Sequence, residues 1–189
     1  IDTAEAQMNQ SICTSRSFGR NVEDLPSLKA SVANFALSCA NKLRAQRAVS
    51  SSVTVFLYSN RFRDDLKQYE NADTFYFLTP TSDSLEIIKA ALQILQNIYR
   101  PGIQYKKTGV VLGRISSSDI IQQDLFDSIP NRPQRMELMK TIDSLNHRYG
   151  PKTIGLLVEE SRERNWHVKS EFRSPNYLTD INEILTIKI

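Results

Sequence analysis

A helix-period apolar stripe between residues 28 and 43 is the feature that most constrains the fold. The stripe comprises Leu28, Val32, Phe35 and Cys39, with Ala36 and Leu43 beside them. Their spacings of three and four residues place them on one face of an α-helix. Asp24 or Ser27 is expected to cap this helix, and Pro26 is acceptable in its first turn. A one-sided helix of this length must bury its apolar face against another layer.

Strand-like segments surround this helix and a second one. Strands are expected at 11–18, 53–58, 74–78 and 103–115, and a charged loop at 61–71. The second helix follows Asp83, which forms a capping-box pattern with Glu86, and ends before Pro101. The order β-α-β-β-α-β predicts an α+β domain with four strands in one sheet and two helices on one face. The other face is then solvated or covered by a partner.

Beyond this domain the sequence changes character. Residues 116–119 and 127–133 are rich in serine, aspartate and proline, which predicts an exposed connector. A helix is expected over about 133–148, followed by a strand at 153–158, as a small α/β tail. Such a tail cannot build much core alone and is expected to pack on a neighbour or to order on binding. The predicted domains are 1–115, a linker at 116–132, and the tail at 133–189.

Composition excludes several classes of protein. The two cysteines, Cys13 and Cys39, have neither the density of a disulfide scaffold nor the spacing of metal ligands. No apolar run approaches the roughly 20 residues that span a bilayer, and no secretory leader is recognisable. We therefore expect a cytoplasmic protein without membrane contact. Because the chain begins at Ile1, we expect it to be part of a longer protein or a processed product.

Catalytic motifs are missing from the sequence. It contains no phosphate-binding Gly-Lys loop, no nucleophile elbow and no zinc-protease helix pattern. His147 and His167 stand alone, and Asp64-Asp65 and Glu159-Glu160 are adjacent pairs of the kind that solvent usually covers. A two-metal site needs carboxylates that converge from different elements. We expect no catalytic residue, no metal site and no cofactor in this chain.

Basic and hydroxyl side chains gather at the first and last predicted strands. Arg16, Ser17 and Arg20 lie at the end of the first strand, and Lys106 and Lys107 lie on the last. In the predicted sheet these two strands can be neighbours, so the side chains form one possible phosphate-binding stripe. The net charge of +3 permits a polyanionic partner. An ordinary solvated edge with scattered charge explains the same residues equally well.

The segment Gln122–Phe126 (Q-Q-D-L-F) stands out within the polar connector. Leu125 and Phe126 are large apolar groups with no evident core to enter. An extended peptide that carries Gln122, Asp124 and these two residues suits a groove on a partner. The alternative is a hydrophobic pin that folds back onto its own domain.

Several segments together resemble one known family. The segments are Ile12–Gly19 (I-C-T-S-R-S-F-G), the β-α-β-β-α-β order, Gln122–Asp127, Leu138-Met139, Ile142-Asp143, Asn146-His147 and Ser174–Thr179. They are similar to the C-terminal region of UmuC-type proteins, the polymerase subunits of bacterial DNA polymerase V in the Y-family of translesion polymerases. The likeness covers nearly the whole chain.

The resemblance implies a role in SOS translesion synthesis. Residues up to 115 would be the little-finger domain, whose sheet lies in the DNA major groove of the primer-template. The implied phosphate contacts are Arg16, Ser17, Arg20, Lys106 and Lys107, with Arg61 and Arg63 as weaker candidates.

The resemblance also implies partners beyond DNA. Gln122 to Phe126 would dock on the sliding clamp, with Gln123 in place of the frequent leucine lowering affinity. The tail would be an extension that touches UmuD-type subunits or RecA. The carboxylates that hold two magnesium ions would precede Ile1, so this portion would not polymerise.

Two other classes of function remain open. The fold serves many purposes, so a ferredoxin-like module that binds RNA or a small molecule is one alternative. Tyr76 and Phe77 are aromatic, but the basic-Gly-aromatic-Gly pattern of RNA-recognition sheets is missing. A protein-interaction domain with incidental charge is the other alternative.

Overall fold

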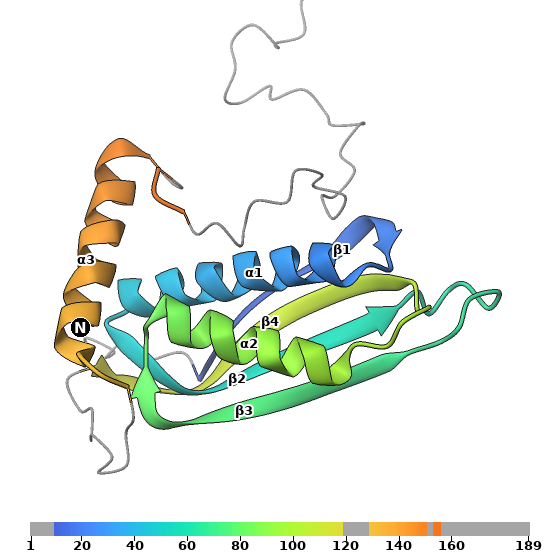
Figure 1. Cartoon of the computed structure of the whole chain (residues 1–189), viewed down its shortest axis with the longest axis horizontal. Helices are drawn as coiled ribbons and strands as arrows, with labels where there is room; N and C mark the ends of the chain where they lie inside the picture. The colour runs from blue at the N-terminus through green and yellow to red at the C-terminus, as the bar shows by residue number, and fades with distance from the viewer. Residues whose placement is uncertain (1–9, 119–128, 151–152, 156–189) are drawn as a thin grey trace, which may run out of the picture.

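One antiparallel sheet with two helices on one face forms the body of the molecule (Figure 1). The computed structural model describes residues 10–118, 129–150 and 153–155. In chain order these form β1 (Ser11–Val22), α1 (Leu25–Ala45), β2 (Ala48–Ser59), β3 (Glu70–Thr81), α2 (Ser84–Ile98), β4 (Tyr105–Ser117) and α3 (Arg132–Tyr149). The strands lie in the order β1-β4-β2-β3, with antiparallel pairs throughout. The predicted α+β fold is confirmed, including the contact between the first and last strands.

Side-chain caps fix the start of both sheet-covering helices. The carboxylate of Asp24 accepts a hydrogen bond from the backbone N–H of Ser27 at 2.7 Å, so Asp24 is the cap of α1. Asp83 accepts from the backbone N–H of Leu85 at 2.8 Å and caps α2. Glu86 does not complete the expected capping box. Its carboxylate is buried and accepts from Arg132 of α3 instead, at 3.0 Å.

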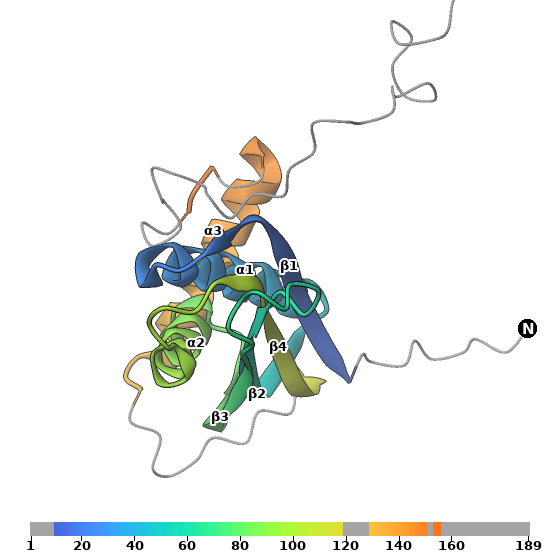
Figure 2. The same ribbon diagram turned by 90° about the vertical axis from the view of Figure 1, so that its right-hand side faces the viewer.

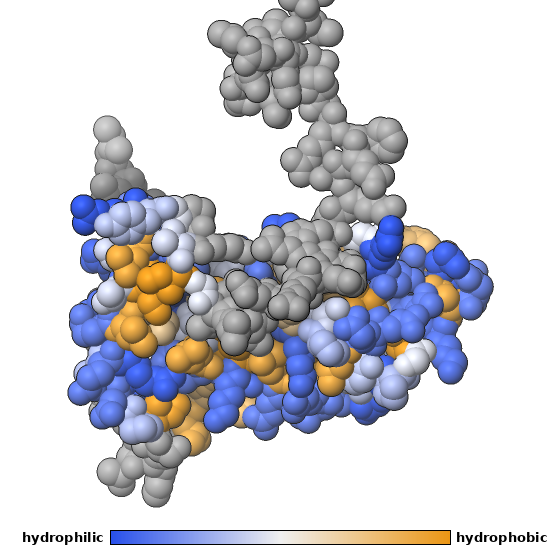
Figure 3. Space-filling model, turned by 45° about the horizontal axis from the view of Figure 1, so that its top comes forward, coloured by the Kyte–Doolittle hydropathy of each residue, from blue (hydrophilic) through white to orange (hydrophobic). Residues whose placement is uncertain are grey.

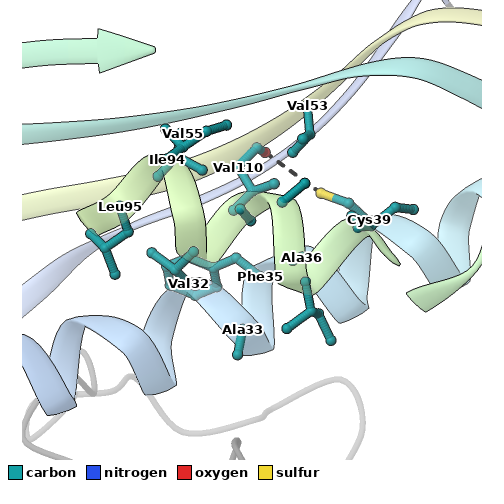
Figure 4. Packing of buried hydrophobic residues seen from close by; sticks show 14 of the residues in the cluster. Val32, Ala33, Phe35, Ala36, Cys39, Val53, Val55, Ile94, Leu95 and Val110 are labelled. Carbon is teal, nitrogen blue, oxygen red and sulfur yellow. Dashed lines mark hydrogen bonds between the residues drawn. The ribbon is translucent and has the colours of Figure 1, made fainter. Parts of the chain in front are cut away.

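The core lies between the helices and the sheet. Residues of both helices pack together against the sheet (Figure 4). They are Val32, Phe35 and Ala36 of α1, Ile94 and Leu95 of α2, and Val53, Val55 and Val110 of the strands. Cys39 lies in this layer, and its thiol donates to the backbone carbonyl of Val110 at 3.5 Å. Because every second residue of β2 is buried here, the register of the sheet is fixed by its apolar face.

The strands are longer than the sequence predicts. Glu70 and Asn71, expected in a loop, pair with Tyr58 and Leu57 as the start of β3. Ser116 and Ser117, expected in the connector, pair with β2 as the end of β4. Polar residues continue these strands because a ladder satisfies backbone groups whatever the side chain. The strand expected at 153–158 is wrong for residues 153–155, which form a bend, and its remainder lies outside the described residues.

Helix α3 stands at the end of the sheet-covering helices and is held mainly by ion pairs (Figure 1). Arg44 of α1 pairs with Asp143 at 2.6 Å, and Arg135 pairs with Asp83 at 2.5 Å. The hydrogen bond to Asp83 raises the pKa of Arg135. Met139 is the one buried residue of this helix, so apolar packing contributes little. The expectation that the tail packs on a neighbour is confirmed for α3.

Apolar groups lie on both sides of α3. Figure 3 shows orange side chains at the end of the molecule where this helix lies, and Met136, Leu138 and Tyr149 are among its exposed residues. A pocket of about 440 Å³ separates α3 from the ends of β2 and β3, with Val49 and Met139 in its lining. Arg44 of α1 and Glu86 of α2 also line this pocket, so it lies on the side of the sheet that the helices cover.

Candidate nucleic-acid interface

One face of the sheet carries no helix (Figure 2). The strand register defines which residues share it, because partners across neighbouring strands point to the same side. Val53, Val55 and Leu57 of β2 are buried under the helices, so the residues that alternate with them face outward. The outward rows run from β1 through β4 and β2 to β3, and we call their surface the open face. Its residues are Ser11, Cys13, Ser15, Ser17, Lys107, Gly109, Val111, Gly113, Ser52, Thr54, Phe56, Tyr58, Glu70, Ala72, Thr74 and Tyr76.

The register brings two of the predicted phosphate contacts together and separates a third. Ser17 pairs with Lys107, which pairs in turn with Tyr58, so all three lie in one row of the open face. Arg16 pairs with Thr108, which pairs with the buried Leu57. The side chain of Arg16 is exposed but belongs to the helix side of β1. The single stripe expected from sequence is therefore divided between two faces.

Arg20 and Lys106 lie where the ladder is irregular. The register between β1 and β4 shifts between Ser17 and Val22, and Arg20 is exposed within that stretch. The ammonium of Lys106 donates to the backbone carbonyl of Phe18 at 2.6 Å, which holds the cation against β1. A lysine fixed in this way has a smaller entropy cost when it binds a phosphate than one that must be ordered.

The two loop arginines differ in their surroundings. Arg61 donates to Glu70 at 2.6 Å, and its guanidinium carbon lies 5.5 Å from the ring centroid of Tyr58. Arg63 forms two hydrogen bonds with Asp65, at 2.6 and 2.5 Å. These bonds raise the pKa of Arg63 and lower the pKa of Asp65. Each guanidinium is thus paired with one exposed carboxylate, and Arg61 differs in that it also lies beside the Tyr58 ring of the open face.

Phe56 and Tyr58 on the open face are functional candidates that the sequence reasoning missed, whereas Tyr76 was considered there only against an RNA-recognition pattern. Phe56 and Tyr58 stack with centroids 4.9 Å apart, and Lys107 lies 6.0 Å from the Phe56 centroid. The guanidinium of Arg114 lies 4.6 Å from the ring of Tyr76. The signal was available in β2, where Phe56 and Tyr58 alternate with buried Val55 and Leu57 and so had to face outward.

Gly109 makes room for the Phe56 ring. A Cβ at this position would lie 2.5 Å from the Cβ of Ser15 and closer still to the ring of Phe56. The missing side chain lets the ring lie across β4 toward β1, where Ser15, Gly109 and Phe56 form one row. The Phe56 ring therefore fills the space over Gly109, and the small open-face residues of β1 beyond it permit close approach of a large ligand.

The described residues contain neither a cluster of metal-binding side chains nor a helix suited to a membrane. No group of three or more His, Cys, Asp or Glu side chains there converges as metal ligands do. Among the helices that the structure describes, none combines the length and apolar character of a membrane span. The predicted clamp-binding residues Gln122, Asp124, Leu125 and Phe126 lie outside the described residues.

The fold and the sequence together define the class of this chain. An α+β domain with an open sheet face is followed by a helix that docks beside it. The family described as the impB/mucB/samB family C-terminal domain matches residues 9–125, and a domain of unknown function matches residues 136–187. The chain belongs to the impB/mucB/samB family. The resemblance to the C-terminal region of UmuC-type proteins is confirmed.

Two curated relatives agree with this assignment. The chain is 34% identical to Protein UmuC of Salmonella typhimurium over 183 residues, which are 97% of this chain and 43% of that protein. It is 35% identical to Protein ImpB of Salmonella typhimurium, again over 97% of this chain and 43% of the relative. The chain thus spans less than half the length of these curated relatives. The crystal structure of DinB from Sulfolobus solfataricus aligns with a TM-score of 0.43 at 14% identity, over 55% of this chain and 28% of that one.

Proposed function

We propose that this chain is the DNA-gripping and clamp-docking portion of an error-prone translesion polymerase that acts in SOS damage tolerance. Membership of the impB/mucB/samB family supports the polymerase context. The observation that carries the DNA-binding part is the row Ser17, Lys107 and Tyr58 on a sheet face without helices. An ammonium and a hydroxyl on neighbouring strands are suited to phosphate oxygens, which position a duplex without reading its sequence.

The charge of the open face supports a polyanionic partner. In its described rows the one carboxylate is Glu70, and Arg61 pairs with that carboxylate. Lys107 and Arg114 lie beside aromatic rings and are not matched by an acidic partner there. A duplex placed on this face would meet Ser17 and Lys107 at the end of the sheet where β2 ends and where Arg61 also lies. Arg16, on the helix side, would reach only a strand that passes the edge of β1.

Salt-dependent duplex binding tests the DNA part. Fluorescence anisotropy with a labelled primer-template duplex should give an affinity that falls steeply with salt and is the same for unrelated sequences. Lys107→Ala should weaken binding uniformly and reduce the salt slope by about 1. The matched control is Lys89→Ala, because Lys89 is exposed on α2 in the helix layer. Undetectable duplex binding at low salt, or equal effects of the two variants, would reject this part.

Clamp docking through Gln122, Leu125 and Phe126 is a proposal from the sequence. The amide of Gln122 would hydrogen-bond at the mouth of the clamp groove, and the two apolar side chains would fill its pocket. The double variant Leu125→Ala, Phe126→Ala should lose co-elution with the sliding clamp and keep its thermal unfolding midpoint. Leu138→Ala, an exposed leucine of α3, is the control. Retention of clamp binding by the double variant would reject the docking segment.

The remaining partners and the cofactor are proposals of the same kind. Magnesium would be needed only in a catalytic part with its own carboxylates, and this portion would bind no cofactor. The region that begins with α3 would contact UmuD-type subunits or RecA. Its exposed apolar residues, which include Leu138 and Tyr149, support a protein partner on that side.

A further inference from the structure

Three aromatic rings on the open face each have a cation beside them. Arg61 lies 5.5 Å from Tyr58, Lys107 lies 6.0 Å from Phe56, and Arg114 lies 4.6 Å from Tyr76, all measured to the ring centroid. The rings come from the adjacent strands β2 and β3, and the cations come from β4 and the loop after β2. Three such pairs on one face exceed what a duplex-phosphate contact requires, because phosphates need only the cations.

The rings are accessible although they lie on a folded surface. Tyr76 is 56% exposed, and Phe56 and Tyr58 are half-buried because they stack on each other. The Phe56 ring reaches over Gly109 toward Ser15, and the small open-face residues of β1 beside it let a planar group approach from that side. Flat aromatic surface that remains exposed to water is a costly feature unless a ligand covers it.

The backbone conformation of Arg114 is a separate observation that favours a binding site on this face. Arg114 lies within β4 but has a φ of 51°, in the left-handed region that non-glycine residues seldom adopt. Its guanidinium is the one closest to a ring among the cation–aromatic pairs in the described part of the chain. Backbone strain of this kind persists where the surroundings hold it and is concentrated at binding sites.

We infer that the open face binds unpaired nucleotides of single-stranded DNA by stacking their bases on Tyr76 and on the Phe56–Tyr58 pair. In a duplex the base faces are covered by neighbouring bases, so only unpaired nucleotides can offer them. Proteins that hold single strands combine aromatic stacking with nearby cations for the phosphates. Arg61, Lys107 and Arg114 lie where the phosphates that flank a stacked base would pass. This inference rests on the proposed DNA binding and adds a base-dependent contact to it.

An abasic oligomer separates stacking from charge. Anisotropy would compare a labelled thymidine oligomer of about ten nucleotides with an abasic sugar-phosphate oligomer of the same number of phosphates. We expect roughly tenfold tighter binding of the thymidine oligomer, since stacking adds a sequence-tolerant contribution for each base. Tyr76→Val should lower the affinity for the thymidine oligomer several-fold, toward that of the abasic oligomer, and leave abasic binding unchanged. Valine preserves the preference for a strand, so this variant should fold.

A tyrosine outside the sheet provides the control for this experiment. Tyr149→Val removes an equally exposed ring that has Arg148 5.5 Å away, but on α3, and should leave both affinities unchanged. Equal binding of the two oligomers by the native chain would overturn the stacking inference while the proposed DNA binding stands. Failure of both oligomers and of the duplex to bind would overturn the proposed function and the inference with it.

Discussion

The guanidinium of Arg44 donates to both carboxylate oxygens of Asp143, from Nε at 2.6 Å and from Nη2 at 2.8 Å. Arg44 belongs to the last turn of α1, and Asp143 belongs to the middle of α3. Arg44 is held in place by further hydrogen bonds to Ser82 and Ser84. A preorganised two-point contact of this kind is stronger than an ordinary surface ion pair, and it joins the two regions matched by different families.

Asp143→Ala is expected to loosen α3 and to leave the sheet intact. The variant leaves the Arg44 guanidinium, 11% exposed, without its carboxylate partner, which should cost about 1–3 kcal/mol. Hydrogen exchange of the α3 amides should accelerate about tenfold or more, while that of β2 and β4 stays unchanged.

Glu137→Ala provides the matched control for this prediction. It removes the Glu137–Lys140 pair of the same helix, whose partners are 71% and 66% exposed. Such a pair should contribute less than about 1 kcal/mol. Equal hydrogen-exchange rates of the α3 amides in Asp143→Ala and Glu137→Ala would show that the Arg44 contact does not hold α3.

Gly109→Ala is expected to destabilise the domain by about 1–3 kcal/mol, because the new Cβ would overlap the Phe56 ring and Ser15. Urea unfolding measures this. Gly113→Ala in the same strand is the comparison, since its Cβ would meet only the hydroxyl of Ser52, at 2.9 Å. That hydroxyl can rotate away, so we expect Gly113→Ala to lower the free energy of unfolding less than Gly109→Ala does. A neutral Gly109→Ala would mean that the ring does not occupy the described position.

The two cysteine thiols should react very differently. Burial raises the pKa of Cys39, and its thiol donates to the Val110 carbonyl, whereas Cys13 is exposed on the open face. Alkylation of the native chain should modify Cys13 alone, and alkylation in guanidinium should modify both. Rapid native modification of both thiols would contradict the described packing of Cys39.

The raised pKa of Cys39 also predicts the direction of a pH effect on stability. The unfolded thiol ionises first as the pH rises, which favours the unfolded state. The contribution of Cys39 to the free energy of unfolding is therefore fully present below the ordinary thiol pKa. It is lost as the pH rises from there toward the pKa of the thiol in the folded protein. The loss approaches about 1.4 kcal/mol for each pH unit in that window. Cys39→Ala should remove this contribution, and urea titrations of both proteins at several alkaline pH values measure it.

The sequence predicted the element order because its periodicities are strong. The apolar stripe of α1 and the buried run of β2 could be read without the structure, and Asp24 was one of two residues, with Ser27, named as the cap. The split of the basic stripe could not be read, because it depends on whether Arg16 or Ser17 pairs opposite Lys107. A register set by long-range pairing leaves no local signal.

The ends of the elements and the docking of α3 were also beyond the sequence. Ser116 and Ser117 are turn-forming residues by composition, yet the β2 ladder extends over them. Glu86 matched a capping-box pattern, but its carboxylate accepts a hydrogen bond from Arg132 of α3, a helix far away in the sequence. In both cases a tertiary contact overrode a local preference.

The central claim is that DNA lies on the open face, and Cys13 reports on it directly. Cys13, the third residue of β1, is exposed on that face and needs no mutation to serve as a probe. Its alkylation rate should be measured with and without saturating primer-template duplex, with binding followed by anisotropy in the same buffer. The account predicts that bound DNA slows the reaction several-fold and that high salt restores the rate as it releases the DNA. An unchanged alkylation rate while the DNA is bound would contradict the account.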